Sequence, residues 1–269
     1  VVKANGFELK SGHTIHIACD TTEMEPVVKS ALKMLVNDFQ AVLSSDVCIG
    51  KEGNIIINKD TTLLDKRKEA FQLKVSDDQL YVTGSDAHGV AYGILEISRL
   101  IGVSPWEWWA DVMPLKRSSF SLANGYVNLQ APSVEFRGIF INDEDWGLMP
   151  WSSLHYEPWH KPGRIGPKTN ARIFELMLRL RANTYWPAMH ECTQPFFLTQ
   201  GNREVAEQYG IYIGGSHCEP MASSTAGEWR KRGKGEYDYV NNSKNVYDFW
   251  EQRVKAVSYT HLTLPTILR

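Results

Sequence analysis

Polar and acidic side chains gather directly after three apolar segments in the middle of the chain. The three groups are Asn142-Asp143-Glu144, His190-Glu191-Cys192 and His217-Cys218-Glu219. Paired carboxyl groups can act as general acid and base, and amide and imidazole groups can hold a polar substrate. One acidic strand end could equally be a helix N-cap or a solvated turn. Three in succession favour the open end of a β/α barrel with a site at its mouth.

The elements that must position these groups alternate between buried strands and amphipathic helices. Residues 134–141 form a largely apolar run with β-branched and aromatic content, which predicts a strand buried on both faces. Residues 183–189 and 211–213 predict the next two strands. Apolar spacing predicts a helix from Thr169, as its cap, to Arg181, a shorter helix over 203–209 and a last helix over 245–256. Between the first strand and the first of these helices lies a loop, 147–168, whose length is typical of functional loops.

The first hundred residues predict a small supporting α/β unit without a cluster of catalytic residue types. Strands are expected over 13–19, 53–58, 71–76 and 79–84, with a hairpin turn at Asp77-Asp78. Helices are expected over 25–43 and from a cap at Asp86 to a stop at Gly102.

The segment 104–115 carries three tryptophans and two prolines. This composition favours a connection that packs against a surface, although a tryptophan cluster can also be a sugar-stacking platform. Residues 120–129 predict a further pair of extended segments around the Asn124-Gly125 turn signal.

Composition and charge exclude several classes of protein. A net charge of −2 over 269 residues argues against nonspecific nucleic-acid binding, and no stretch approaches the about 20 apolar residues of a membrane span. Four scattered cysteines do not form a disulfide framework. Adjacent residues on a strand point in opposite directions, so neither His-Cys-Glu group can direct all its side chains at one zinc ion. We therefore expect no metal and no cofactor.

Four motifs resemble glycoside hydrolase family 115, the xylan α-1,2-glucuronidases. They are FRGIFINDEDW, HYEPWHKPG, RANTYWPAMHE and YGIYIGGSHCEPM, within a resemblance that covers roughly 104–256. The resemblance implies removal of glucuronic acid or its 4-O-methyl ether from glucuronoxylan by inverting hydrolysis without a metal. It also admits a homodimer of the full-length protein.

By motif match, the resemblance implies six residues that line the substrate pocket: Asn142, Asp143, Trp186, His190, His217 and Glu219. The catalytic acid and base are expected on later barrel strands and stay unknown, with Asp143 and Glu219 as weak candidates. Trp186 could stack on the sugar or belong to the core below the barrel rim. Lys161 and Arg164 are weak candidates for binding a uronate carboxylate, since charges on a loop are often merely solvated.

The predicted organisation is a small α/β N-terminal domain followed by the first part of a TIM (β/α)8 barrel, truncated. Its parts are a supporting domain (1–115), connecting strands (116–133), the start of the catalytic barrel (134–256) and a tail (257–269) resembling translated sequencing-adapter sequence. We expect this chain alone to be inactive. Two other functions remain open, a noncatalytic xylan-binding or carbohydrate-binding protein and another barrel glycosidase such as a hexosaminidase. A polymeric substrate implies a secreted or periplasmic protein.

Overall fold

The computed structural model describes residues 6–143, 146–158, 163–188, 192–215, 223 and 225–257. The chain divides into two compact units, one of Val1–Glu135 with Glu175–Arg181 and the other of Phe136–Phe174 with Ala182–Arg269. Both units contain helices and strands, as predicted.

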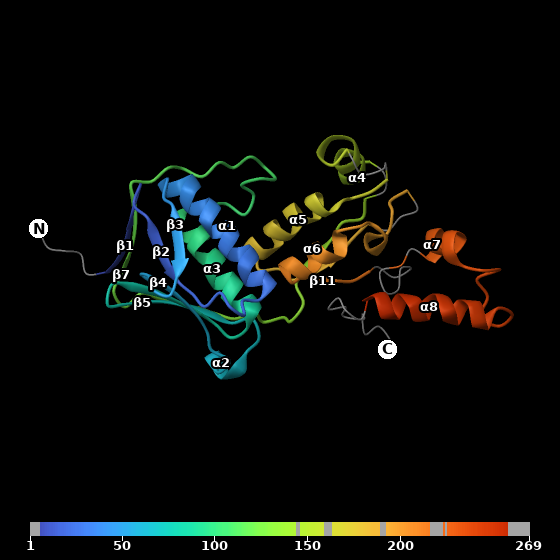
Figure 1. Cartoon of the computed structure of the whole chain (residues 1–269), viewed down its shortest axis with the longest axis horizontal. Coiled ribbons are helices and arrows are strands. Elements are labelled where there is room, and N and C mark those ends of the chain that lie inside the picture. Colours follow the sequence, from blue (N-terminus) through green and yellow to red (C-terminus); the bar gives the residue numbers. More distant parts are fainter. Residues whose placement is uncertain are drawn as a thin grey trace, which may run out of the picture. The chain divides into compact units, whose positions relative to one another are not determined.

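The first unit is built on a six-stranded sheet with the order β3-β2-β4-β6-β5-β8. Five of its strands run in the same direction, and β5 is antiparallel to both of its neighbours. Helices α1 and α3 lie side by side (Figure 1), and α3 packs on the central strands. The bounds are β2 (Ile15–Ala18), α1 (Pro26–Leu43), β3 (Val47–Gly50), β4 (Ile55–Lys59), α2 (Leu63–Lys66), β5 (Phe71–Ser76), β6 (Gln79–Gly84), α3 (Ala87–Ile101) and β8 (Val127–Gln130).

Local sequence signals account for the ends of several of these elements. The carboxylate of Asp86 accepts a hydrogen bond from the Gly89 backbone N–H, which caps α3, and Gly102 ends that helix with φ 101°. Asp77 and Asp78 both have positive φ, of 53° and 59°, as the tight turn of the β5–β6 hairpin requires. These elements confirm the predicted helix and hairpin.

The extended pair predicted around Asn124-Gly125 does form two strands, but they do not pair with each other. Strand β7 (Ser119–Ala123) pairs with β1 (Gly6–Lys10) in a separate two-stranded sheet, and β8 pairs with β5. The turn itself is present, since the Tyr126 N–H donates to the Ala123 carbonyl at 3.1 Å. The turn therefore redirects the chain between two sheets.

The second unit contains a three-stranded parallel sheet with the order β11-β10-β9. The strands are β9 (Gly138–Phe140), β10 (Thr184–Trp186) and β11 (Tyr212–Ile213), and they alternate with α5 (Pro167–Arg179) and α6 (Asn202–Tyr209). The side chain of Tyr185 is fully buried, and its ring lies 5.4 Å from that of Phe174 in α5. The predicted alternation of strand and helix is confirmed here.

Strand β9 is not buried on both faces, contrary to the prediction. Ile139 and Phe140 are 41% and 44% exposed. Ile139 and Phe140 point to opposite faces, so side chains on both faces of the strand are exposed. Among the described residues β9 pairs only with β10, so it forms an edge of the sheet.

The predicted loop 147–168 contains helical structure. A short helix, α4 (Leu148–Trp151), continues directly into a π-helical turn over Ser152–Tyr156. A 3₁₀ turn covers Phe196–Leu198. Further along the chain, α7 (Thr225–Arg232) and α8 (Ser243–Val257) pack through Trp229, Val246 and Phe249. Of these two helices only α8 was predicted.

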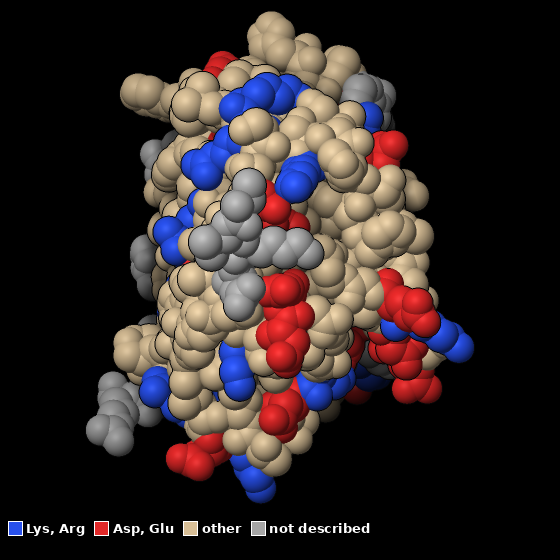
Figure 2. Space-filling model, turned by 90° about the vertical axis from the view of Figure 1, so that its left-hand side faces the viewer, with Lys and Arg blue, Asp and Glu red and all other residues tan. Residues whose placement is uncertain are grey.

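Charged side chains of both signs lie on the face shown in Figure 2. Acidic groups form a row in its lower half, with basic groups above and beside them, so neither sign covers this face alone. Among the described residues, no helix combines the length and apolarity needed to cross a membrane.

Candidate functional site

The candidate site lies where the parallel strands of the second unit end. Parallel strands present their carboxyl ends at the same edge of a sheet, so the residues that end or follow β9 and β10 lie at that edge. Asn142 and Asp143 follow β9, and Trp186 is the last residue of β10. The structure therefore places three of the six predicted pocket residues at one edge. The other three, His190, His217 and Glu219, lie outside the described residues.

Asp143 is held firmly in the turn after β9. Its side chain is 7% exposed, and its Oδ1 accepts a hydrogen bond from the Trp146 backbone N–H at 3.3 Å. Its Oδ2 accepts from the backbone N–H of Met149, in the first turn of α4. The carboxylate thus binds otherwise unpaired N–H groups at the start of that helix. Burial and the charge of Asp143 both raise the pKa of the neighbouring Tyr185 phenol, so this tyrosine stays neutral.

A pocket of about 530 Å³ opens beside Asp143. It is lined by Ile141, Asn142, Asp143, Trp146, Gly147 and Leu148. Trp146 is 90% exposed, which is unusual for a side chain with so large an apolar surface. An indole face, a carboxylate and an amide are the groups with which proteins bind the apolar face and the hydroxyls of a sugar.

Trp146 was not among the predicted site residues. The prediction concentrated on the polar groups that follow the strand, whereas Trp146 is the aromatic residue that closes the same acidic run. Its position at the end of that run was the available signal.

Trp186 lies on the face of the sheet opposite Tyr185. Its register partner on β9 is Phe140, and the two rings meet edge to face at 5.9 Å between centroids. On this face Trp186, Phe140, Thr184 and their neighbours line a second pocket, of about 320 Å³. Trp186 is therefore accessible from a cavity and is not enclosed in the core, so the sugar-stacking interpretation remains open.

Glu157, in the predicted functional loop, is a structural residue. It is fully buried and accepts hydrogen bonds from the Lys168 and Thr169 backbone N–H groups at 3.0 and 2.8 Å, and from the Thr169 hydroxyl at 2.7 Å. These N–H groups belong to the first turn of α5, where a carboxylate is also favoured by the helix dipole. Thr169 was predicted to be the cap of this helix. It lies inside α5 instead, and Glu157 supplies the capping oxygens.

Two buried amides hold the end of the same loop. The Asn170 side chain donates to the Gly166 carbonyl at 3.0 Å and to Asn202 Oδ1 at 3.1 Å, and Asn202 donates to the Ile165 carbonyl at 3.0 Å. This network ties the residues before α5 to the start of α6. Arg164, a predicted carboxylate ligand, is half-buried in this segment, whereas Lys161 lies outside the described residues.

Of the two His-Cys-Glu groups, only Cys192 lies within the described residues. Within the described ranges, no three His, Cys, Asp or Glu side chains come close enough to hold a metal ion. The expectation of a metal-free site stays a prediction.

Comparison with known proteins assigns the family. The model of glycosyl hydrolase family 115 matches residues 129–268, which includes the tail predicted to be adapter-derived. A solved structure described as a family GH115 4-O-methyl-α-glucuronidase, BtGH115A, with specificity for decorated arabinogalactans, is 58% identical over 96% of this chain, with a TM-score of 0.91. None of the curated proteins matches.

Two other solved structures share the fold at low identity. A GH20 exo-β-N-acetylglucosaminidase from Vibrio harveyi is 14% identical, with a TM-score of 0.54, over 99% of this chain and 44% of its own. A β-hexosaminidase from Streptomyces plicatus is 11% identical, with a TM-score of 0.52, over 79% of this chain and 42% of its own.

The chain spans 36% of the length of BtGH115A. The family model covers more than half of the chain and includes the strand ends that carry Asn142, Asp143 and Trp186. As its motifs predicted, this chain belongs to glycosyl hydrolase family 115.

Proposed function

We propose that this chain forms one side of the active site of an α-glucuronidase that removes 4-O-methylglucuronic acid or glucuronic acid from a glycan by inverting hydrolysis. The observation that carries the proposal is the 58% identity to BtGH115A, which is described as a 4-O-methyl-α-glucuronidase. The pocket at the end of β9 supports it, because carboxylate, amide and indole groups suited to a sugar line that pocket.

In this proposal Asn142, Asp143 and Trp186 bind the substrate together with His190, His217 and Glu219. Inverting hydrolysis requires a carboxylic acid and a carboxylate about 6.5–9.5 Å apart, with a water molecule between the base and the sugar. Asp143 already accepts two backbone N–H groups, so its oxygens are fixed in position. A fixed carboxylate can orient a sugar hydroxyl or a water molecule, and Asp143 and Glu219 stay weak candidates for the pair.

We further propose that β9, β10 and β11 are the first three strands of a (β/α)8 barrel. Their parallel order along the sheet follows the sequence, and helices intervene, as in such barrels. A three-stranded sheet does not enclose a barrel interior, so we expect residues 1–269 alone to release no uronic acid.

We propose a decorated arabinogalactan as the glycan that carries the uronate. BtGH115A is described as specific for decorated arabinogalactans, which favours this class for the present protein as well. The motif resemblance suggests glucuronoxylan as the alternative. In either case the substrate is a polymer, so we expect the protein to be exported from the cell, which fractionation would test.

The test is an assay of the full-length protein that contains this chain, with uronic acid release measured from arabinogalactan and from glucuronoxylan. Trp186→Ala is expected to lower kcat/KM by tenfold or more, because stacking is lost. Tyr247→Ala is the control, since Tyr247 is an exposed aromatic residue of α8 and lines neither pocket described above.

Two outcomes would contradict the proposal. Binding of either polysaccharide without release would support the noncatalytic alternative. Release of N-acetylhexosamine and no uronate would support a hexosaminidase, for which the present support is likeness of fold alone.

A further inference from the structure

A third pocket lies in the first unit, beside the carboxyl ends of β2 and β4. Strand β2 is connected through α1 to β3, its neighbour on one side in the sheet. Strand β4 is its neighbour on the other side, where β6 and β5 follow in the sheet. Ligands of open α/β sheets bind in the crevice outside the carboxyl ends of strands at such a switch point. The pocket lies at this place, between the residues that follow β2 and those that end β4.

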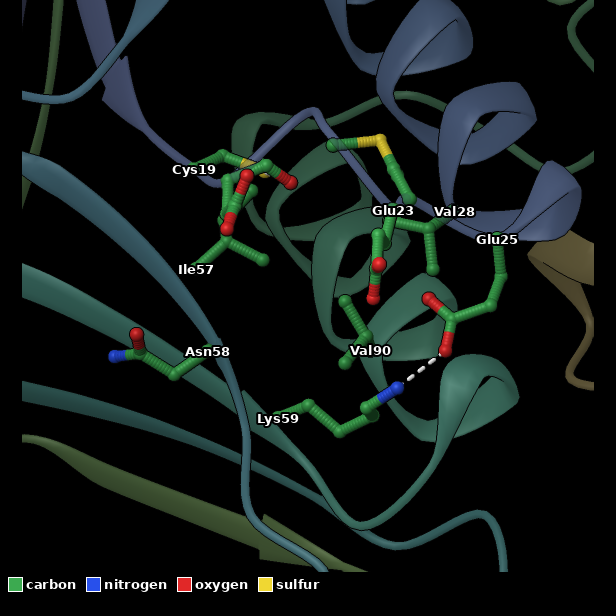
Figure 3. A pocket seen from close by; sticks show the side chains of 10 residues that line it. Cys19, Glu23, Glu25, Val28, Ile57, Asn58, Lys59 and Val90 are labelled. Carbon is green, nitrogen blue, oxygen red and sulfur yellow. Dashed lines mark hydrogen bonds and ion pairs between the residues drawn. The ribbon is translucent and has the colours of Figure 1, made fainter.

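The pocket has an apolar floor and a polar rim. Its volume is about 210 Å³. Met24, Val28, Ile57 and Val90 are each at most 9% exposed and line it from four different segments. The remaining lining residues are Cys19, Asp20, Glu23, Glu25, Asn58 and Lys59. In Figure 3 the Glu23 side chain projects toward Val90, and a dashed line joins Glu25 to Lys59.

Most of the charged groups on the rim already have hydrogen-bond partners. Lys59 Nζ donates to Glu25, and this hydrogen bond lowers the pKa of that carboxyl. Asp20 accepts hydrogen bonds from the Thr22 hydroxyl at 2.7 Å and from the Thr22 backbone N–H at 2.9 Å, which lower its pKa in the same way. Both carboxylates are therefore ionised at neutral pH and already hydrogen-bonded, and Glu23 is exposed to solvent.

This lining selects among classes of ligand. Three carboxylates against one ammonium group disfavour a phosphate or a uronate. An organic cation binds tightly to a buried, unpaired carboxylate, whereas here Glu25 and Asp20 have partners and Glu23 remains hydrated. A neutral polyol needs both donors and acceptors around an apolar surface. Lys59 and Glu23 can supply these groups above the aliphatic floor, whereas the Asn58 side chain points away from them (Figure 3).

We propose that this pocket binds a single neutral sugar unit, with its apolar ring face on Val28 and Val90 and its hydroxyls on Glu23 and Lys59. Its volume is below the about 300 Å³ at which pockets for drug-sized ligands begin, so it suits one ring and not a chain of several. The pocket would give the protein a glycan contact apart from the strand ends of the second unit. The inference does not depend on the proposed hydrolysis.

Binding can be measured by saturation-transfer difference NMR on the purified chain, with galactose and xylose as neutral probes. Glucuronate serves as the anionic probe and ethanolamine as the cationic probe. Galactose or xylose is expected to give transfer that Lys59→Ala abolishes, whereas any transfer from glucuronate bound at the strand ends of the second unit is expected to survive that substitution. If neither neutral sugar binds, or if glucuronate or ethanolamine gives transfer that Lys59→Ala abolishes, the proposal is wrong.

The rate at which Cys19 is alkylated can show whether the sugar binds in this pocket. Cys19 lines the pocket, while Cys48 is an exposed free thiol on β3 and is not among the lining residues. Burial and the nearby Asp20 raise the pKa of the Cys19 thiol, so alkylation is best followed above neutral pH. Saturating sugar is expected to slow alkylation of Cys19 at least twofold and to leave Cys48 unchanged. Equal rates at Cys19 with and without sugar would exclude this pocket as the binding site.

Substitution of Lys59 tests its role as a donor. Lys59→Ala is expected to weaken sugar binding about tenfold or more, since it removes a charged hydrogen-bond donor. Lys10→Ala is the matched control, because Lys10 also forms an exposed ion pair on a strand of the same unit, with Glu8. Equal affinities of the two variants, both folded by circular dichroism, would contradict the assigned contact.

Discussion

The indole of Trp186 occupies the space that a side chain at Gly214 would need. A Cβ atom at Gly214 would lie 2.3 Å from Trp186 Nε1, far closer than any normal contact. Gly214 comes two residues after Tyr212, the register partner of Thr184, so it lies on the same face of the sheet as Trp186. The absence of a side chain at one strand end therefore sets where the aromatic ring of the next strand can lie.

Gly214→Ala is expected to lower the free energy of unfolding by about 1–3 kcal/mol, because Trp186 must move away from the added methyl group. Chemical denaturation followed by tryptophan fluorescence would measure this. Gly50→Ala is the control, since a Cβ there meets nothing within 4 Å. An equal, small effect of both substitutions would show that the Trp186 ring is not confined by Gly214.

Asp143→Asn is expected to loosen the segment after β9. An amide has one acceptor oxygen, so it can accept only one of the two backbone N–H groups that the carboxylate binds. The free energy of unfolding is therefore expected to fall by about 1–3 kcal/mol. Hydrogen exchange in the peptide 146–156 would report the change as faster exchange of the Met149 N–H. Asp248→Asn, which removes only an exposed ion pair with Lys244, is expected to leave that peptide unchanged.

Glu157→Ala is expected to destabilise α5 by about 1.5–3 kcal/mol, since it removes the acceptor of three hydrogen bonds at a buried helix start. The free energy of unfolding and the exchange of the Thr169 N–H would both report it. Glu204 also lies in the first turn of a helix, α6, but is exposed. Glu204→Ala is therefore expected to lower the free energy of unfolding by at most about 1 kcal/mol. If the two substitutions lower the free energy of unfolding equally, the hydrogen bonds of Glu157 do not stabilise α5 as proposed.

The acid stability of the first unit is expected to depend on Glu96. Burial acts to raise the pKa of this carboxyl, but hydrogen bonds and charges from Arg99 and Arg181 outweigh it and hold the pKa below the ordinary value of 4.5. A carboxyl with a depressed folded-state pKa stabilises the fold above its unfolded pKa and loses this contribution as the pH falls through the folded value. Stability should therefore decline below about pH 4.5.

Glu96→Gln should lower stability at neutral pH and flatten this decline. Glu251→Gln, which alters an exposed helical ion pair with Lys255, should change neither. Thermal unfolding between pH 3 and 7 would compare the two variants. If the stability of Glu96→Gln depends on pH as that of the wild type does, groups other than Glu96 cause the acid sensitivity.

The parts of the fold that the sequence predicts well are those determined by local chemistry. The Asp77-Asp78 turn forms because both residues tolerate positive φ, and α3 begins and ends at Asp86 and Gly102 through backbone hydrogen bonds close by in the chain. The Asn124-Gly125 turn shows the limit. It forms as expected, but the pairing of the strands on either side depends on β1 and β5, which are distant in sequence.

The candidate site shows the same division. The polar runs after the strands identified Asn142 and Asp143, because strand ends can be recognised from a change in composition. The structural role of Glu157 could not be seen, since it caps a helix that starts ten residues later, at Pro167. The identity of the catalytic acid and base is equally beyond the sequence, because it depends on distances across the site.

The exposed edge of β9 has a consequence for the behaviour of this polypeptide in solution. Within the described part of the chain, β9 has no neighbouring strand on one side and its Ile139 and Phe140 are accessible, so a strand of another molecule can add there. The polypeptide is therefore expected to self-associate as its concentration rises. Ile139→Lys is expected to reduce such association, because a charged side chain on an edge strand disfavours strand addition.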